Sequence, residues 1–151
     1  MAQSKNTKFD EDNLYHKALL AVLEKRASDY INIAERKSLY NVIIAKEIRA
    51  IEMPQEIKEF KIDYLDGEEL YRKFIEYKKT KSKDERDELK IMFVHPMKNK
   101  GSKIEVRFTD HWYRRKKNNT FLALEGGSIV TFVFDCKTEK FIVENVELWG
   151  V

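Results

Sequence analysis

The sequence predicts an α+β fold in which two helices pack on a curved and mostly antiparallel sheet. Apolar residues recur at helical spacing in two stretches of the first half of the chain, whereas from Leu89 onward they recur at every second position. The connections between the strands of the second half are short, which suits hairpins better than parallel crossovers. We therefore expect a meander of four to six strands wrapped on one or two helices.

Length and composition favour one globular domain, residues 1–151. The chain has 42% hydrophobic and 36% charged residues with five Gly and two Pro, which is not the composition of a disordered protein. Its formal net charge of +3 is too small to predict nucleic-acid binding by itself. No apolar run approaches the roughly 20 residues of a membrane span. The single cysteine, Cys136, excludes a disulfide within one chain and fits a reducing compartment without requiring it.

The first helix is predicted from Asp10 to about Arg26, after a flexible N-terminus at residues 1–9. Its apolar stripe consists of Tyr15, Ala18, Leu19, Val22 and Leu23. His16 is expected at the edge of this helix, on the surface. The next stretch, 39–51, is compatible with either a strand or a helix, and the β-branched residues 42–44 favour a strand at 39–46.

A strand at 60–64 and a second helix follow. Asp66 and Glu69 have the spacing of a capping box, and the helix turns Leu70, Phe74 and Tyr77 inward. Residues 78–88 are predicted as a solvated, charged connector.

Four strands are predicted after this connector, at 89–96, 103–116, 120–136 and 140–151, and turns separate them. The large apolar residues of the third strand change parity at Gly126-Gly127. This change predicts a bulge or bend there, which curls the sheet around a helix.

Asp110 is the main candidate for catalysis, because it shares the parity of the apolar residues Val106 and Phe108. A carboxylate inside a concave sheet would have a raised pKa and could act as a general base, alone or with His95 from a neighbouring strand. The other interpretation, which we favour, places Asp110 in solvent or pairs it with Arg107 or Arg114.

His95 and Tyr113 complete the catalytic candidates. His95 precedes Pro96 at a strand end, where a cross-strand hydrogen bond is a simpler role than that of a base. No His, Cys and carboxylate spacing matches a zinc site, so neither a metal nor a cofactor is expected.

The segment 98–117 carries eight basic against two acidic residues, and aromatic residues interleave with them. This pattern makes Arg107, His111, Trp112, Arg114 and Arg115 candidate ligand-binding residues, with the turn at 114–117 as a polyanion site. Lys and Arg at hairpin tips usually serve solubility, so nucleic acid is not the expected partner.

Two resemblances accompany these patterns. The stretch "DYLDGEELYRKFIEY" followed by a meander resembles the NTF2-like or SnoaL-like α+β cone, with a cystatin-like cone as a related possibility. Such a fold implies a helix inside a curved sheet and a pocket, but its members include isomerases, dehydratases and binding modules. The fold alone would not settle the function.

The C-terminal strands, "GGSIVTFVFDC" and "FIVENVELWGV", are similar to the C-terminal signature of a group of small exported proteins of Bacteroidetes bacteria. The resemblance implies export to the periplasm or the medium, with a cytoplasmic location as the alternative. A start at Ala2-Gln3-Ser4 with a restored initiator Met would agree with a removed signal peptide. The matching residues, which are expected to serve packing and turns, are Gly126, Gly127, Phe132, Phe134, Asp135, Cys136, Glu147, Trp149 and Gly150.

Three functions remain open at this point. The leading hypothesis is a non-enzymatic, exported binding or protein-interaction module for an unknown protein or small molecule. The second is a SnoaL-like pocket enzyme of the isomerase or hydrolase type that uses Asp110 or His95. The third is a polyanion binder that uses the 114–117 turn.

Overall fold

A computed structural model describes residues 7–29, 39–48 and 50–150. The two helices are α1 (Leu14–Asp29) and α3 (Gly67–Thr80). The strands are β1 (Asn41–Ala45), β2 (Glu56–Ile57), β3 (Phe60–Leu65), β4 (Leu89–Val94), β5 (Lys98–Lys100), β6 (Lys103–Lys116), β7 (Asn119–Asp135) and β8 (Lys140–Gly150). The predicted flexible N-terminus at 1–9 falls mostly outside the described residues.

The predicted α+β class with a mostly antiparallel sheet is confirmed. The strand order is β2-β3-β1-β4-β6-β7-β8, with β5 paired to β6, and β4, β6, β7 and β8 form the expected antiparallel meander. The predicted count of four to six strands was too low, because β2 and β5 are short strands in segments that look like loops and the sheet has eight strands. The parallel part of the sheet is β1, which is parallel to both β3 and β4.

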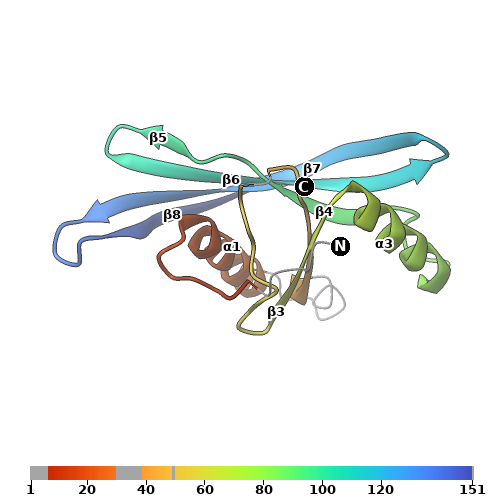
Figure 1. Cartoon of the computed structure of the whole chain (residues 1–151), viewed down its shortest axis with the longest axis horizontal. Helices are drawn as coiled ribbons and strands as arrows, with labels where there is room; N and C mark the ends of the chain where they lie inside the picture. The colour runs from red at the N-terminus through yellow and green to blue at the C-terminus, as the bar shows by residue number, and fades with distance from the viewer. Residues whose placement is uncertain (1–6, 30–38, 49, 151) are drawn as a thin grey trace.

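The two long hairpins run along the upper side of the molecule in Figure 1, with α1 beneath one end and α3 beneath the other. Even-numbered residues of β6, such as Val106 and Phe108, are buried against Leu19 and Val22 of α1. The side-chain oxygen of Asn13 accepts hydrogen bonds from the backbone N–H groups of Tyr15 and His16 and so caps the start of α1.

The odd-numbered side of the same strands faces α3. Leu89, Ile91 and Phe93 of β4 and Tyr113 of β6 are buried in a second cluster with Leu70 and Phe74 of α3. The predicted capping box is confirmed, since the Asp66 side chain accepts from the backbone N–H of Glu69, and the Glu69 side chain accepts from that of Asp66. The helix continues to Thr80, into the predicted connector.

The predicted bulge at the glycine pair is also confirmed. Asp110 pairs with Gly126 and His111 pairs with Leu124, so Glu125 is an extra residue on β7. A Cβ on Gly126 would come within 2.4 Å of the Trp149 carbonyl oxygen, which explains why glycine stands beside the bulge. Neither α1 nor α3, the two described helices, is long and apolar enough to cross a membrane.

Candidate functional site

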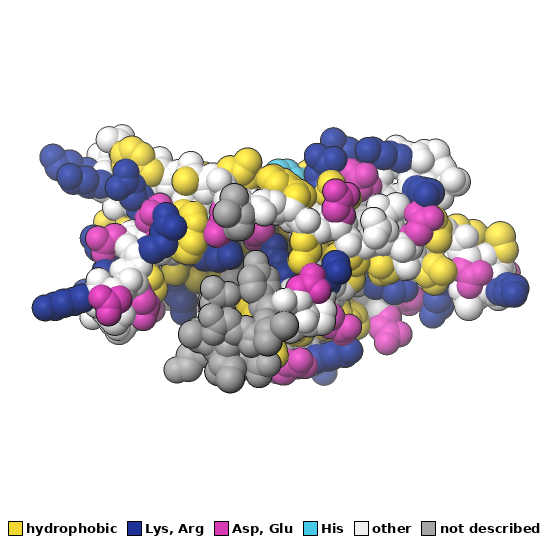
Figure 2. Space-filling model, turned by 180° about the vertical axis from the view of Figure 1, so that it is seen from behind, with side chains coloured by type: hydrophobic (Ala, Val, Ile, Leu, Met, Phe, Trp, Pro, Cys, Tyr) yellow, Lys and Arg dark blue, Asp and Glu magenta, His cyan; other side chains and the backbone are white. Residues whose placement is uncertain are grey.

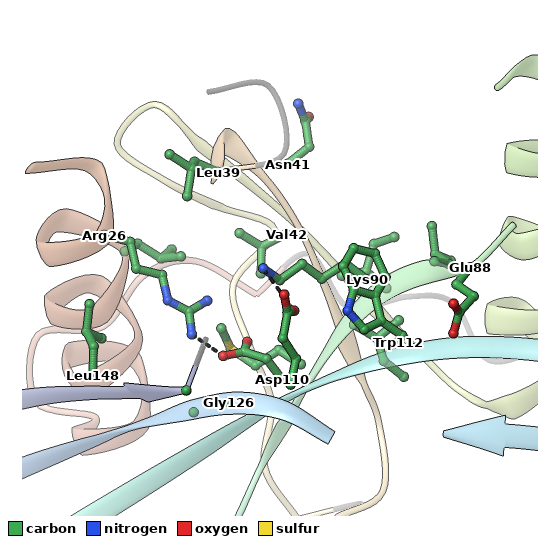
Figure 3. Close-up of a pocket in the computed structure, with 18 of the residues that line it drawn as sticks. Arg26, Leu39, Asn41, Val42, Glu88, Lys90, Asp110, Trp112, Gly126 and Leu148 are labelled. Carbon is green, nitrogen blue, oxygen red and sulfur yellow. Dashed lines mark hydrogen bonds and ion pairs between the residues drawn. The ribbon is translucent and has the colours of Figure 1, made fainter. Parts of the chain in front are cut away.

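A pocket of about 690 Å³ lies between the C-terminal half of α1, the start of β1 and the centre of the sheet. Figure 3 shows Arg26 reaching from α1 toward Asp110 on β6, with Lys90 and Trp112 farther along the same wall. The apolar part of the wall includes Leu23, Leu39, Val42, Met92 and Leu148. The glycine pair 126–127 lies along the same pocket, beside the bulge that bends β7.

Asp110 is buried in this pocket and paired with an arginine from the first helix. Its side chain is 9% exposed, and its Oδ2 lies 2.5 Å from an Nη of Arg26, whose side chain is 15% exposed. The favoured prediction, a solvated carboxylate or a pair with Arg107 or Arg114, is therefore wrong. Arg107 and Arg114 lie on the strand of Asp110, whereas Arg26 comes from an element that is distant in sequence and close in the fold.

The ion pair keeps part of its hydrogen-bonding capacity. A guanidinium has five N–H donors, and the one bond from Arg26 to a described residue goes to Oδ2 of Asp110. No described residue donates to the other carboxylate oxygen. Because the two charges compensate each other, the pair offers donors and an acceptor to the pocket with little net charge.

Trp112 is one of three aromatic residues in the wall, with Tyr77 and Trp149. The guanidinium of Arg86 lies 4.3 Å from its ring centroid, and the ammonium of Lys90 lies 5.8 Å away. Lys90 Nζ is also 3.3 Å from Oε2 of Glu125, the bulged residue of β7. The two cations hold the Trp112 ring in place, and the Lys90–Glu125 ion pair links β4 to β7.

The second proposed catalytic residue, His95, does not join Asp110. The residues that face α3 have odd numbers on β6, and His95 Nε2 lies 2.8 Å from Oγ1 of Thr109, on that side. Asp110 faces α1, so the structure does not bring it together with His95 in the dyad that was considered as an alternative. Burial lowers the pKa of His95 below its usual value of 6.5, and the predicted role as a cross-strand hydrogen bonder is confirmed.

Tyr113 and His111 belong to the α3 side as well. The Tyr113 ring meets Phe74 edge-on at 5.5 Å, and burial raises the pKa of its hydroxyl. The ring of His111 meets Phe93 edge-on at 4.8 Å. Neither residue lines the pocket with Asp110.

The three arginines proposed as ligand-binding residues lie away from the pocket. Arg107 donates to Glu105 on its own strand at 3.2 Å. Arg114 lies 4.7 Å from the ring centroid of Phe121, and Arg115 lies 4.2 Å from that of Tyr71. Among the residues first proposed, the pocket brings together Asp110 and Trp112 alone.

His16 was expected on the surface and is buried, with 2% of its area exposed. The backbone N–H of Asp10 donates to its Nδ1 at 3.1 Å, and its Nε2 lies 2.6 Å from the carbonyl oxygen of Glu52. Because a carbonyl can only accept, Nε2 carries the proton. His16 shares its helix face with Leu19 and Leu23 at spacings of three and seven, and this signal could have predicted the burial.

Within residues 7–29, 39–48 and 50–150, no group of three His, Cys, Asp or Glu side chains is placed to hold a metal ion. No protein-family model, no curated protein and no solved structure matches the chain.

Proposed function

We propose that this chain is a non-enzymatic binding protein and that its pocket takes a small organic ligand with a flat apolar part and a neutral polar group. The pocket volume of about 690 Å³ falls in the range of known small-molecule sites. Its wall combines apolar side chains and the indoles of Trp112 and Trp149 with two ion pairs, Arg26–Asp110 and Lys90–Glu125. Apolar and aromatic walls with a small number of placed polar groups are usual in such sites.

The Arg26–Asp110 pair is the observation that carries this proposal. A hydroxyl or amide group can donate to the open carboxylate oxygen and accept from the remaining guanidinium N–H groups at the same time. A ligand with a full charge would instead compete with one partner and leave the other without compensation. The polar end of the ligand is therefore neutral.

The apolar part of the ligand would lie between Trp112 and the aliphatic residues Val42 and Met92. Planar groups bind well against an indole, because contact area and ring geometry both contribute.

A catalytic role is the less favoured candidate. A general base must be free to take a proton from the substrate, and Oδ2 of Asp110 is already engaged by Arg26. The imidazoles of His95 and His111 lie on the side of the sheet that faces α3. A SnoaL-like enzyme would therefore have to use Asp110 without a second base from these two residues.

Binding can be tested with a set of neutral bicyclic aromatic compounds that carry a hydroxyl or a primary amide, such as 2-naphthol and indole-3-carboxamide. We expect some of them to raise the melting temperature and to bind in calorimetry. Trp112→Leu should weaken binding by about tenfold or more, which corresponds to about 1.4 kcal/mol. Phe134→Leu is the matched control, because Phe134 is an exposed aromatic residue of β7 that does not line the pocket.

The proposal fails if no compound of the set binds, or if binding to Trp112→Leu is unchanged. Conversion of a compound by the native protein but not by Asp110→Asn would replace it with the enzyme alternative.

Export is a separate proposal and rests on the resemblance of the C-terminal strands. A tagged copy of the complete gene in a Bacteroidetes host should appear in the periplasmic fraction or the medium. Recovery from the cytoplasmic fraction alone would refute export.

A further inference from the structure

One end of β7 has an open edge. The last pair between β7 and β8 joins Gly126 to Gly150, so residues 119–124 of β7 are paired with β6 on one side and with no described strand on the other. Residues 119–124 belong to the hairpin of β6 and β7. In this hairpin, β6 is paired on its other side with β4 as far as Tyr113. Such an edge presents unpaired backbone N–H and C=O groups in a row.

This open edge, residues 119–124, lacks the features that usually protect an edge strand. Its sequence, NTFLAL, contains no charged residue, no proline and no glycine, and all six residues are exposed. Phe121, Leu122 and Leu124 are 43%, 47% and 59% exposed. By contrast, the free edge of β8 carries Glu144 and Glu147, and charges of this kind discourage unwanted pairing.

A basic cluster lies directly beside the open edge. Arg114, Arg115, Lys116 and Lys117 form the end of β6 and the turn into β7, and no acidic residue occurs from His111 to Leu124. The guanidinium of Arg114 stacks on Phe121 of β7, and that of Arg115 stacks on Tyr71 of α3. These contacts hold both side chains beside the open edge. Figure 2 shows dark blue basic side chains at this end of the molecule, with yellow hydrophobic ones beside them.

We propose that the open edge is a docking site for an extended peptide segment of a partner protein, in which acidic residues flank an alternating apolar run. The segment would add to the sheet as a strand beside β7, with main-chain hydrogen bonds to residues 119–124. Its apolar side chains would cover Leu122 and Leu124 on the side of α3, and its acidic residues would meet the basic cluster. This site does not depend on the pocket or on its ligand.

Charge complementarity favours this partner over a second copy of the chain. Two copies joined through this edge would bring together two segments that each carry four basic residues and no acidic one. A partner strand with acidic ends removes that repulsion and gains attraction. Nucleic acid would use the same charges but leave the unpaired backbone groups of the edge unsatisfied.

The test compares two labelled peptides, DEVTVTVTDE and its basic counterpart KKVTVTVTKK, by fluorescence anisotropy with the full chain. We expect the acidic peptide to bind at least about tenfold more tightly than the basic one at about 150 mM salt. The double variant Leu122→Lys/Leu124→Lys should lose about tenfold or more in affinity, because lysine blocks edge pairing. Ile142→Lys is the matched control, since Ile142 is an exposed apolar residue (42%) on β8, away from the open edge.

Two further measurements separate strand addition from simple charge attraction. Amide protons of residues 119–124 should gain protection from hydrogen exchange when the acidic peptide binds. The double variant Lys116→Glu/Lys117→Glu should bind the acidic peptide more weakly and the basic peptide more tightly than the native chain does.

The proposal is overturned if neither peptide binds, if the leucine variant binds the acidic peptide as well as the native chain does, or if no amide of the edge gains protection. Displacement of the peptide by an equal concentration of single-stranded DNA would assign the site to polyanions instead. A dimer in sedimentation experiments that the leucine variant abolishes would assign it to a second copy.

Discussion

Arg26 and Asp110 join the first helix to the centre of the sheet, with Nη and Oδ2 2.5 Å apart although the two residues are 84 positions apart in sequence. Both side chains are mostly buried, so each charge depends on the other for compensation. The pair therefore has two effects. It attaches α1 to β6, and it places one guanidinium and one carboxylate in the wall of the pocket.

Asp110→Ala and Arg26→Ala should each lower the free energy of unfolding by about 3 kcal/mol, because either change leaves an uncompensated buried charge. Arg26→Met/Asp110→Leu should recover most of this loss, since it removes both charges together. Urea unfolding followed by circular dichroism measures the effect. Arg107→Ala serves as the control, because the Arg107 side chain is 43% exposed and Lys100 remains to compensate Glu105. This change should therefore cost less than about 1 kcal/mol. Equal losses at Asp110 and Arg107 would contradict a buried pair.

Gly127→Ala should destabilise the protein by about 2 kcal/mol or more, since the added methyl group has no room and forces the strands apart. A Cβ there would lie 2.5 Å from the Phe108 carbonyl oxygen and 2.7 Å from the Trp149 ring. Gly67→Ala is the matched control at the start of α3, where no atom lies within 4 Å. Thermal unfolding of both variants checks the difference, and a Gly127→Ala protein as stable as Gly67→Ala would show that the close packing is not there.

The elements that sequence reasoning predicted correctly depend on local patterns. Alternation in β6, the capping box at Asp66 and Glu69, and the bulge beside Gly126 each involve neighbours within a few residues. Local backbone and side-chain preferences are enough to fix such features. The elements therefore began and ended close to their predicted positions.

The errors share a different origin, because each depends on an element that is distant in sequence. The partner of Asp110 comes from α1, and the bond that buries His16 comes from the carbonyl of Glu52. The parallel pairing of β1 with β3 and β4 depends on two connections, residues 46–59 between β1 and β3 and the crossover through α3 between β3 and β4. The parity of Asp110 predicts that its side chain faces inward, but it does not predict which basic residue pairs with it.

Ser128→Ala should raise the free energy of unfolding by about 1 kcal/mol, because a buried hydroxyl without a partner keeps its desolvation penalty. Ser128 is fully buried, and its Oγ has no hydrogen-bond partner among the described residues. Ser82→Ala, at an exposed position, should change stability by less than about 0.5 kcal/mol. Chemical denaturation of both variants is the measurement. A clear loss of stability in Ser128→Ala would mean that the hydroxyl is satisfied in solution.

His95 should make the protein less stable as the pH falls below about 6.5. Burial is the main reason that its pKa is lowered in the folded chain, with smaller contributions from His111, Arg107 and Lys98 against an opposing one from Glu47. Between the unfolded pKa and the lower folded pKa, the unfolded chain binds more protons, so acidification favours unfolding. Above this window both states hold a neutral imidazole, and the contribution of His95 to the pH dependence disappears.

The measurement compares native protein and His95→Gln at about pH 7.5 and about pH 5.5, on either side of the ordinary histidine pKa. Gln cannot titrate but can still bond to Thr109, so this variant should lose less stability on acidification than the native chain does. In proton NMR, the ring of His95 should titrate with a midpoint below 6.5. A midpoint above that value, or an equal pH dependence in both proteins, would refute a neutral, partly buried imidazole, because a solvated or acid-paired ring would hold its proton at least as strongly as the unfolded chain.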